Sequence, residues 1–345
     1  MAVGNNIPHQ GWQSALVIAK QATSTTFVTA GSFIEFNSES LKPEREELKL
    51  ASINTTRDYH KRLIGNESIA GAIEMDLNGN NDGCINLIKQ AMGGTLSSSA
   101  HVSSAAAYTH TIRVGDMESN AASAGASRMQ SLSIGVRKGA TNTWQVAGCR
   151  INTLGIKAEI GSPVILNADI IGQSVTNHTS IGAAAVSFNN DLPLLFNNVT
   201  VEVGDSITNA STEEFFTAFE IELGNNLDGD QRALGSRNIV NSYPGKRDLT
   251  VKLTQRFDTL TAHNRFLQNT LTAIKITLDS GVTLAGASVT NSLIINIPQA
   301  YWNSNTPETG DVGVMVHEIE AGAIYDSTAA YAIEMTLVNG TASYD

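Results

Sequence analysis

The sequence predicts a mainly β protein built from two tandem copies of one unit. Segments in which apolar and polar residues alternate with period two recur along the whole chain. Only two segments have the apolar spacing of a helix, and each directly follows an alternating strand. The two strands concerned, 69–77 and 249–257, lie 180 residues apart. The chain is therefore interpreted as a structural duplication, although the identity between the copies is low.

The alternating segments are typical of half-buried antiparallel strands. Ile69 and Ile73 fall on one face of the first paired strand, as Val251 and Leu253 do in the second. Such strands bury one face and leave the other to solvent or to a partner. The predicted strands are Phe33–Phe36, Glu67–Leu77, Gln130–Arg137, Gly148–Ile160, Val164–Ile171, Val199–Val203, Ala218–Leu223, Leu249–Phe257, Ala273–Leu278, Ser292–Ile297 and Gly313–Ala321.

Two helices are predicted. The first covers Asn81–Met92, begins at good capping residues and ends at a pair of glycines. The second covers Thr261–Thr272, with Thr259 or Thr261 as its cap.

Two segments differ from this pattern. Thr95–Gly125 is rich in Ser, Ala and Gly, and it is expected to be a long loop or insertion around a short strand near Thr109–Val114. Residues 173–185 are small and polar, and they are expected to form a linker. This predicts a first domain over 1–172, which includes the insertion 95–125, and a second over 186–345.

The charge distribution argues against a protein that grips nucleic acid. Charged residues form only 16% of the chain, and the net charge is −11. Residues 1–172 hold 14 basic and 14 acidic residues, whereas 173–345 hold 8 and 19. Binding through phosphate neutralisation needs a basic stripe, and none is visible. The short cluster Arg57, Lys61 and Arg62 is interpreted as an exposed strand or loop.

Membrane and secretory classes are not favoured either. No apolar run approaches the roughly 20 residues of a membrane-spanning helix, and no secretory signal is visible at the N-terminus. Two cysteines allow one bridge at most, which argues against a disulfide scaffold.

Two segments are rich in side-chain oxygens that could bind a cation. Asp76–Gly83 has oxygen ligands at alternate positions, but a calcium loop needs glycine where Asn81 stands and a bidentate acid where Leu87 stands. We therefore expect a strand-to-helix turn with a capping residue. Asn225–Asp230 is expected to be a hairpin tip, with a surface cation as the less favoured alternative.

No enzyme chemistry is predicted, and no catalytic, cofactor-binding or metal-binding residue is assigned. The seven histidines have no metal-ligand spacing, and no P-loop, G-x-S-x-G or dinucleotide-binding motif is present. Cys84 and Cys149 are interpreted as core thiols. Trp12, Trp144 and Trp302 are too scattered for a base-stacking platform.

Several of these segments, taken in order, resemble the major tail tube proteins of long-tailed bacteriophages. The early strand Phe33–Phe36 precedes a polar segment, and Gly65–Leu77 is similar to the "g-x-x-x-v-x-G-s-i-x-x-x-l" strand of that family. A short helix ending at Gly94 follows, and Val146–Leu154 is similar to its "G-c-x-v-n-x-l" strand. In the second half, Phe196–Val201 and Phe219–Leu227 match as well. The insertion at 95–125 departs from the family pattern.

The resemblance implies tandem β-sandwich or split-barrel units, each with a flanking helix and a long hairpin. Hairpins of neighbouring units would join into a central barrel, and stacked rings would form a tube that guides double-stranded DNA. The hairpins expected to contribute to the inner wall are Leu41–Glu67 and Gly224–Asp248, and the wall is expected to be acidic or neutral. Three chains are expected per ring, with six as the alternative.

The implied partners are other copies of the chain, the tape measure protein, the tail terminator and the baseplate or distal tail protein, with no membrane. The implied location is the virion tail, after assembly in the host cytoplasm. Another virion β protein, such as a capsid decoration or baseplate hub component, is the alternative. A third is a carbohydrate-binding β-sandwich with Trp144 and Trp302 as platforms.

Overall fold

The computed structural model describes residues 10–21, 26–29, 31–51, 57–59, 61–94, 96–114, 130–139, 142–178, 181, 192–212, 215–305, 307 and 312–344. The first half contains β1 (Ala15–Lys20), β2 (Ser32–Ile34), β3 (Ser38–Glu39), β4 (Lys42–Lys49), β5 (Arg62–Asp76), α1 (Asp82–Met92), β6 (Leu96–His101), β7 (Ser104–Arg113), β8 (Leu132–Lys138), β9 (Asn142–Glu159), β10 (Ile165–Gly172) and β11 (Ser174–His178). The second contains β12 (Val199–Gly204), β13 (Ser211–Thr212), β14 (Phe216–Gly224), β15 (Asp248–Arg256), α2 (Thr261–Leu267), β16 (Thr272–Thr283), β17 (Thr290–Asn305), β18 (Val316–Ala323) and β19 (Glu334–Asn339). Short 3-10 turns lie at Gly11–Gln13, Phe196–Asn198 and Ile207–Asn209.

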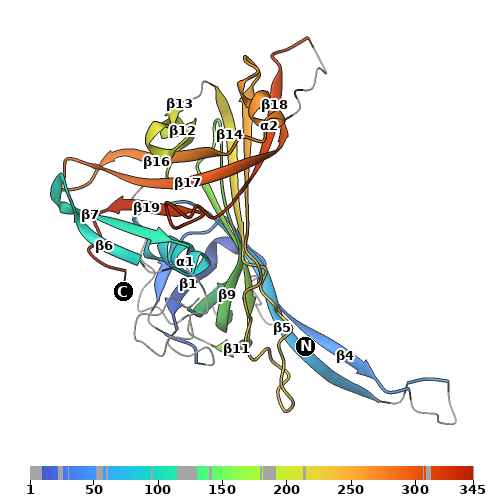
Figure 1. Cartoon of the computed structure of the whole chain (residues 1–345). Helices are drawn as coiled ribbons and strands as arrows, with labels where there is room; N and C mark the ends of the chain where they lie inside the picture. The colour runs from blue at the N-terminus through green and yellow to red at the C-terminus, as the bar shows by residue number, and fades with distance from the viewer. Residues whose placement is uncertain are drawn as a thin grey trace.

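A central antiparallel sheet runs through both halves of the chain. Its order is β3 and β4 side by side on β5, then β10, β9, β14, β15, β18 and the end of β17. In Figure 1 these strands run together past the rest of the molecule, which lies on one side of them. The mainly β fold class is therefore confirmed.

Two outer sheets cover one face of the central sheet. The first has the order β2–β1–β8–β9–β11, and the second the order β13–β12–β16–β17–β19. The strands β9 and β17 are long because each begins in an outer sheet and ends in the central one. Alternate residues of the central strands, among them Ile73, Ile156, Ile221 and Leu253, are buried against these outer sheets.

The two outer sheets and the two halves of the central sheet repeat one topology. The first repeat, β1–β11, and the second repeat, β12–β19, have the same strand order, with α1 and α2 packed on β9 and β17 respectively. Ile73 pairs with Ala168 in the first repeat, and Leu253 pairs with Ile319 in the second. Residues 180 positions apart in β5 and β15 are therefore structurally equivalent, as the sequence predicted for these two strands. The tandem arrangement is confirmed.

Two irregularities of the strand pairing are also repeated. Asn152 is unpaired between β9 and β10, and Asn303 is unpaired at the equivalent place between β17 and β18. A second irregularity lies near Gly148 of β9, which has a φ of 68°. The second repeat has its counterpart between Thr272 and Ile274. Bulges at matching places in both copies are strong evidence for duplication, because a bulge needs one extra residue at one position.

The helix predictions are confirmed for α1 and corrected for α2. The side chain of Asn81 accepts hydrogen bonds from the backbone N–H groups of Gly83 and Cys84, and Gly93 ends the helix in a left-handed conformation. The second helix ends at Leu267, because Asn269 adopts a left-handed φ of 50°. Thr272, predicted to end it, begins β16 instead. Its N-cap is Leu260 rather than Thr259 or Thr261.

The segment 95–125 is not a loop in the part that the structure describes. Residues 96–113 form the hairpin β6–β7, and β7 pairs with β19. The hairpin therefore extends the outer sheet of the second repeat, although it belongs to the first in sequence. The short strand predicted near Thr109–Val114 lies within β7, whereas the loop expected before it is wrong, since Ser97–Ser99 lie on an exposed strand.

Among the described residues, no helix has the length and apolar character needed to cross a membrane.

Candidate assembly surfaces

One strand pair joins the two repeats within the chain. β14 of the second repeat lies antiparallel to β9 of the first, with Gly224 opposite Thr153 and Ile221 opposite Ile156. The central sheet is continuous across this joint, which we call the internal joint.

The bulged Asn152 anchors the chain where β14 ends. The backbone N–H of Asn225 donates to the carbonyl of Asn152 at 2.7 Å, and the N–H of Leu227 donates to Oδ1 of Asn152 at 2.8 Å. The side-chain amide of Asn225 donates to the carbonyls of Ala91 and Ile151, both at 3.0 Å. Asn225 is only 1% exposed. Asn152 and Asn225 therefore connect the two repeats through hydrogen bonds to backbone groups.

The connection between β14 and β15, residues 225–247, folds against the first repeat. Arg232 donates from Nη1 to the carbonyl of Glu67 at 2.9 Å, and Glu67 donates its N–H to the carbonyl of Arg237 at 2.9 Å. Gln173 donates from Nε2 to the carbonyl of Val240 at 2.9 Å. The predicted second hairpin is correct at its ends, since Gly224 pairs with Asp248. Residues 225–247, which connect these ends, form one isolated β-bridge and no longer strand pairing.

Among the residues that the structure describes, no strand pairs with β3 and β4 on the side away from β5, so the central sheet has a free edge there. The N–H of Ser40 donates to the carbonyl of Ala72 on β5 at 2.9 Å. Since N–H directions alternate along a strand, those of residues 41 and 45 point away from β5. The N–H of Leu41 is bonded to Oε2 of Glu39 at 3.2 Å, and Pro43 has none. This edge is thus partly blunted, as exposed edges commonly are.

Within the described part of the chain, the opposite free edge lies at the end of β17. There β17 pairs with β18 on one side, with Trp302 opposite Ala321 and Ser304 opposite Glu320. The unpaired Asn303 between them is exposed. In the first repeat the same edge, on β9, is occupied by β14.

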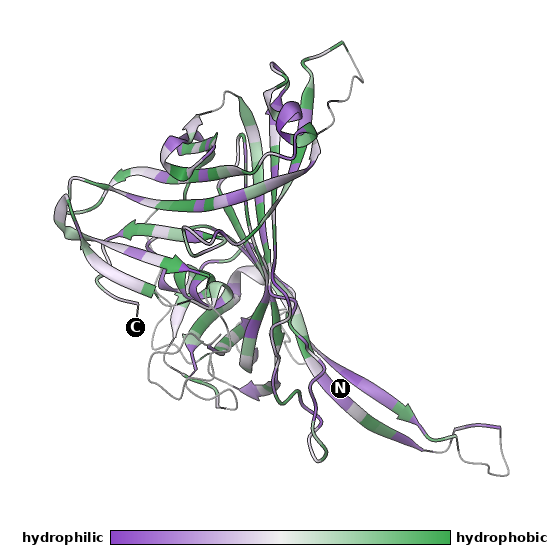
Figure 2. Cartoon of the chain, viewed as in Figure 1, coloured by the Kyte–Doolittle hydropathy of each residue, from purple (hydrophilic) through white to green (hydrophobic). Residues whose placement is uncertain are grey.

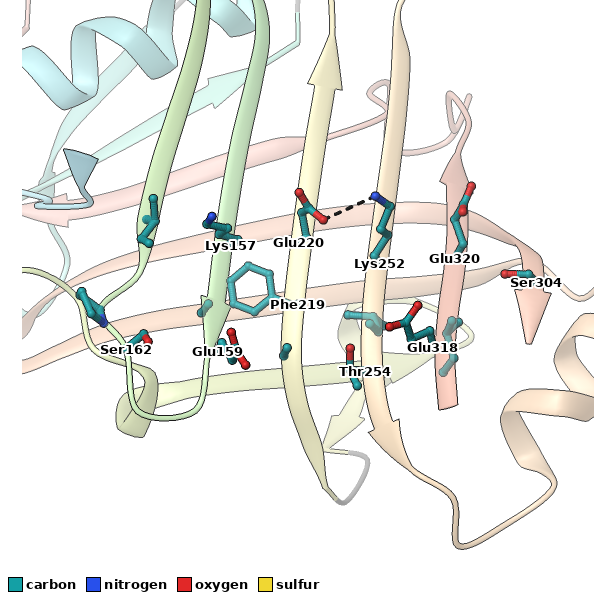
Figure 3. Close-up of a pocket in the computed structure, with 16 residues that line it drawn as sticks. Lys157, Glu159, Ser162, Phe219, Glu220, Lys252, Thr254, Ser304, Glu318 and Glu320 are labelled. Atoms are coloured by element: carbon teal, nitrogen blue, oxygen red, sulfur yellow. Dashed lines mark ion pairs between the residues drawn. The ribbon is translucent and has the colours of Figure 1, made fainter. Parts of the chain in front are cut away.

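The uncovered face of the central sheet has a row of alternating charges. Lys157, Glu220, Lys252 and Glu320 stand directly opposite one another on four neighbouring strands, and Figure 3 shows them side by side. Lys252 Nζ lies 3.5 Å from the carboxylate of Glu220. Opposite charges directly across strands stabilise the pairing. The row borders a shallow depression of about 450 Å³.

Acidic side chains predominate on this face as a whole. Alternation and register place both signs of charge there, mixed with Ser, Thr, Asn and Ala. The basic residues on the six strands from β5 to β18 are Arg62, Arg150, Lys157, Lys252 and Arg256. The acidic residues on the same strands are Glu67, Glu74, Asp76, Glu159, Asp169, Glu220, Glu222, Asp248, Glu318 and Glu320.

The β4–β5 hairpin projects away from the body of the molecule (Figure 1). It matches the predicted hairpin Leu41–Glu67 in position. Its base carries ion pairs such as Lys42–Glu44 at 2.9 Å and Arg45–Glu67 at 3.2 Å. Apolar side chains toward its far end, including Leu63, are exposed, as the green patches of Figure 2 indicate. A hairpin of this kind is expected to be covered by a partner.

The two oxygen-rich segments have structural roles. Asp76 Oδ1 accepts a hydrogen bond from Asn37 Nδ2 at 2.7 Å, and Asn81 caps α1, as the turn interpretation predicted. In the second segment, Asn225 and Leu227 form the anchor described above. Asp228 Oδ1 accepts the N–H of Asp230 at 3.1 Å. No cluster of three potential metal ligands occurs among the described residues.

The structure also gives the surroundings of both cysteines and of two tryptophans. Cys84 and Cys149 are both buried free thiols, as predicted. Burial raises the pKa of the Cys84 thiol to about 12 and that of Cys149 beyond its ordinary range. Trp302 is 5% exposed and cannot act as a sugar platform. Trp144 is covered by Lys138, whose Nζ lies 4.2 Å from the ring centroid.

A buried polar network was not anticipated from the sequence. His110 of β7 is 0% exposed, its Nδ1 lies 2.8 Å from Ser98 Oγ, and its Nε2 lies 3.1 Å from Asn339 Oδ1. Asn339 Nδ2 donates to the carbonyl of Gly79 at 2.8 Å. The network connects the β6–β7 hairpin, β19 and the turn before α1. No pattern in the sequence indicates that His110, on a strand of mixed burial, is buried and bonded in this way.

The fold and its surfaces define a β-sheet protein whose two free sheet edges and uncovered polar face suit association with other chains. Residues 11–335 match the family described as "Phage tail tube protein". The chain belongs to this phage tail tube protein family.

The tail tube of bacteriophage SPP1, solved by solid-state NMR and cryo-EM, is similar over 44% of this chain and 82% of that chain, with 14% identity and a TM-score of 0.30. No curated protein matches the chain. Family membership makes the protein a structural component of the virion tail that self-assembles, not a member of an enzyme family.

Proposed function

We propose that the chain assembles into rings that stack into the tail tube, and that double-stranded DNA passes through the tube during ejection. The observation that carries this proposal is the open central sheet. Among the described residues, it has one face packed on the outer sheets, two free edges, and a polar face that is uncovered except where residues 225–247 contact Ile171 and Arg150. Copies joined edge to edge would close such a sheet into a barrel whose polar face lines the lumen.

Each ring contains three chains and has pseudo-sixfold shape. The internal joint supplies one of the two kinds of contact between neighbouring units, and contacts between chains supply the other. The chain is divided into tube domains at 1–172 and 186–345, with 173–185 between them. The expected linker is nevertheless wrong for residues 174–178, because β11 pairs with β9 and belongs to the first repeat.

The uncovered face keeps the DNA mobile. Its acidic side chains repel phosphates, and the repulsion acts over a Debye length of about 8 Å at physiological ionic strength. A lumen that bound phosphate firmly would retain the genome, because each neutralised phosphate strengthens binding.

The tube also contacts the other proteins of the tail. The tube encloses the tape measure protein and is bounded by the tail terminator and by the baseplate or distal tail protein. It assembles in the host cytoplasm, has no catalytic activity and needs no metal. A capsid decoration or baseplate hub role is the alternative. Burial of Trp302 disfavours the carbohydrate-binding interpretation.

Electron microscopy of the purified chain tests this proposal. Stacked rings or tubes with a central channel are the expected result. Isolated monomers at high protein concentration, or binding only to preformed capsids, would contradict it.

A further inference from the structure

The internal joint is a template for the contact between two copies of the chain. In the first repeat the edge of β9 is occupied by β14, whereas the equivalent edge of β17 is free. In the second repeat β14 occupies the place that β3 and β4 hold in the first: Ile221 pairs with Val251 of β15, and Glu39 pairs with Ile73 of β5. Each free edge therefore has a counterpart whose partner is known.

The strand register of the internal joint fixes the register expected between two copies of the chain. Residues of β15 lie 180 positions after their counterparts in β5, and those of β17 lie 151 positions after those of β9. Gly224, which pairs with Asp248, corresponds to Glu44, which pairs with Ser68. Thr153 corresponds to Ser304, since they pair with Asp169 and Glu320 respectively.

We propose that the end of β17 in one copy pairs antiparallel with β4 of the next copy, with Ser304 opposite Glu44. This rests on the ring assembly proposed above and specifies its contact between chains. The bulged Asn303 takes the role of Asn152. Its carbonyl accepts the N–H of Arg45, the counterpart of Asn225, and its side-chain oxygen accepts the N–H of Glu47, the counterpart of Leu227.

The free edges already have the geometry for this. The N–H of Arg45 points away from β5, because the N–H of Ser40 points toward it and the directions alternate up to that residue. Asn303 is exposed, whereas Asn152 is half-buried and its Oδ1 accepts the N–H of Leu227. A side chain that is occupied in one repeat is thus presented to solvent in the other.

A proline distinguishes this contact from its template. Pro43 stands where the internal joint has Leu223. By the same alternation, Pro43 lacks an N–H that would cross to the neighbouring chain. The contact between copies consequently has fewer backbone hydrogen bonds than the internal joint. Proline at this edge also limits pairing with foreign strands before assembly.

Disulfide trapping tests the register. Residues 44 and 304 are a non-hydrogen-bonded pair, whose Cα atoms lie about 4.5 Å apart, within reach of a disulfide. Glu44→Cys with Ser304→Cys is expected to give covalent dimers and trimers when assembled protein is oxidised. Ser38→Cys with Ser304→Cys is the matched control, since six residues of strand separate Ser38 from Glu44 by roughly 20 Å. Thr153→Cys with Gly224→Cys should close within one chain.

The outcomes separate the register from the assembly. Rings that form but show no cross-link at 44 and 304, or an equal cross-link in the Ser38 control, would overturn the register and leave ring assembly standing. An unmodified chain that forms no rings would instead refute the assembly on which the register rests.

A second pair of variants covers the case in which the cysteines prevent assembly. Asn303→Ala should raise the concentration needed for assembly about fivefold for each lost hydrogen bond and leave the melting temperature of the monomer unchanged. Asn303→Asp keeps the acceptor oxygen and should assemble far better than the alanine variant. Equal assembly of the alanine variant and the unmodified chain would overturn the role of Asn303.

Discussion

The backbone N–H of Asn225 donates to the carbonyl of Asn152 at 2.7 Å, so the first residue after β14 is bonded to a bulge of β9. This bond lies at the point where the two repeats meet, and the bulge that makes it possible occurs again at Asn303. The internal joint at β9 and the free edge at the end of β17 therefore have the same local strand structure, including the bulge.

Replacement of Asn225 should destabilise the folded chain. Asn225→Ala removes the two hydrogen bonds to Ala91 and Ile151 and leaves both carbonyls without that donor in a buried site. We expect a loss of about 1–3 kcal/mol in the free energy of unfolding, measured by urea denaturation. Ser211→Ala, at an exposed residue of β13, is the control and should change little. Equal midpoints for both variants would show that the anchor carries no stability.

His317 should make stability fall as the pH is lowered. It is 3% exposed, its ring packs edge-on against Phe257, and neither ring nitrogen has a hydrogen-bond partner in the described part of the chain. Burial lowers its pKa, which the charge of Asp258 only partly opposes. Below the ordinary value of about 6.5, the unfolded chain binds a proton that the folded chain does not. Stability therefore decreases from that pH down to the lowered pKa and then levels.

The variant His317→Leu removes this contribution. Its melting temperature should vary less between pH 7 and 5 than that of the unmodified chain, and the two curves should differ most at the acidic end. Parallel curves over the whole range would mean that His317 does not titrate differently in the two states.

The row of alternating charges should stabilise the central sheet. Lys252→Glu places three acidic side chains opposite one another, with Glu220 and Glu320 on either side. Like charges directly across strands cost up to about 1 kcal/mol for each pair. Lys252→Gln should therefore be more stable than Lys252→Glu, and the gap should narrow at high salt. A gap that salt does not alter would indicate a cause other than charge.

The two native thiols should be inert while the chain is folded. The pKa of Cys84 is raised to about 12 and that of Cys149 is raised further, so almost no thiolate exists at pH 8. A thiol reagent should label both only after denaturant is added. Rapid labelling of the native protein would contradict the buried positions.

The acidic face should prevent retention of DNA. Glu222→Lys with Asp169→Lys reverses two exposed charges on that face, and assembled tubes of this variant should bind double-stranded DNA with an affinity that falls as salt rises. Asp205→Lys, next to β12 in an outer sheet, is the control and should bind far less. Equal binding by both variants would show that the uncovered face is not the lumen.

Much of the fold could be predicted from period-two patterns, and every predicted strand overlaps an observed one. The missed strands have other compositions. Buried β1 is a continuous apolar run, whereas β4 is almost entirely charged and fully exposed. Alternation is present only where one face of a strand is buried and the other is wet. Neither a strand buried on both faces nor one that stands free of the body produces it.

The assembly surfaces could be predicted only in part. The strands 69–77 and 249–257 indicated the duplication, because burial preserved their pattern while identity was lost. The bulges at Asn152 and Asn303 could not be foreseen, since a bulge depends on the register between two strands and one asparagine carries no such information. The path of residues 225–247 depends on contacts with Glu67 and Gln173, which are distant in sequence.

The central claim is that each chain supplies two units of a closed ring, and a cryo-EM reconstruction of the assembled tube tests it most directly. The account predicts three copies of the 345-residue chain per ring, with pseudo-sixfold shape and with β17 of each copy beside β4 of the next. Six equivalent copies of the full chain in each ring would contradict it.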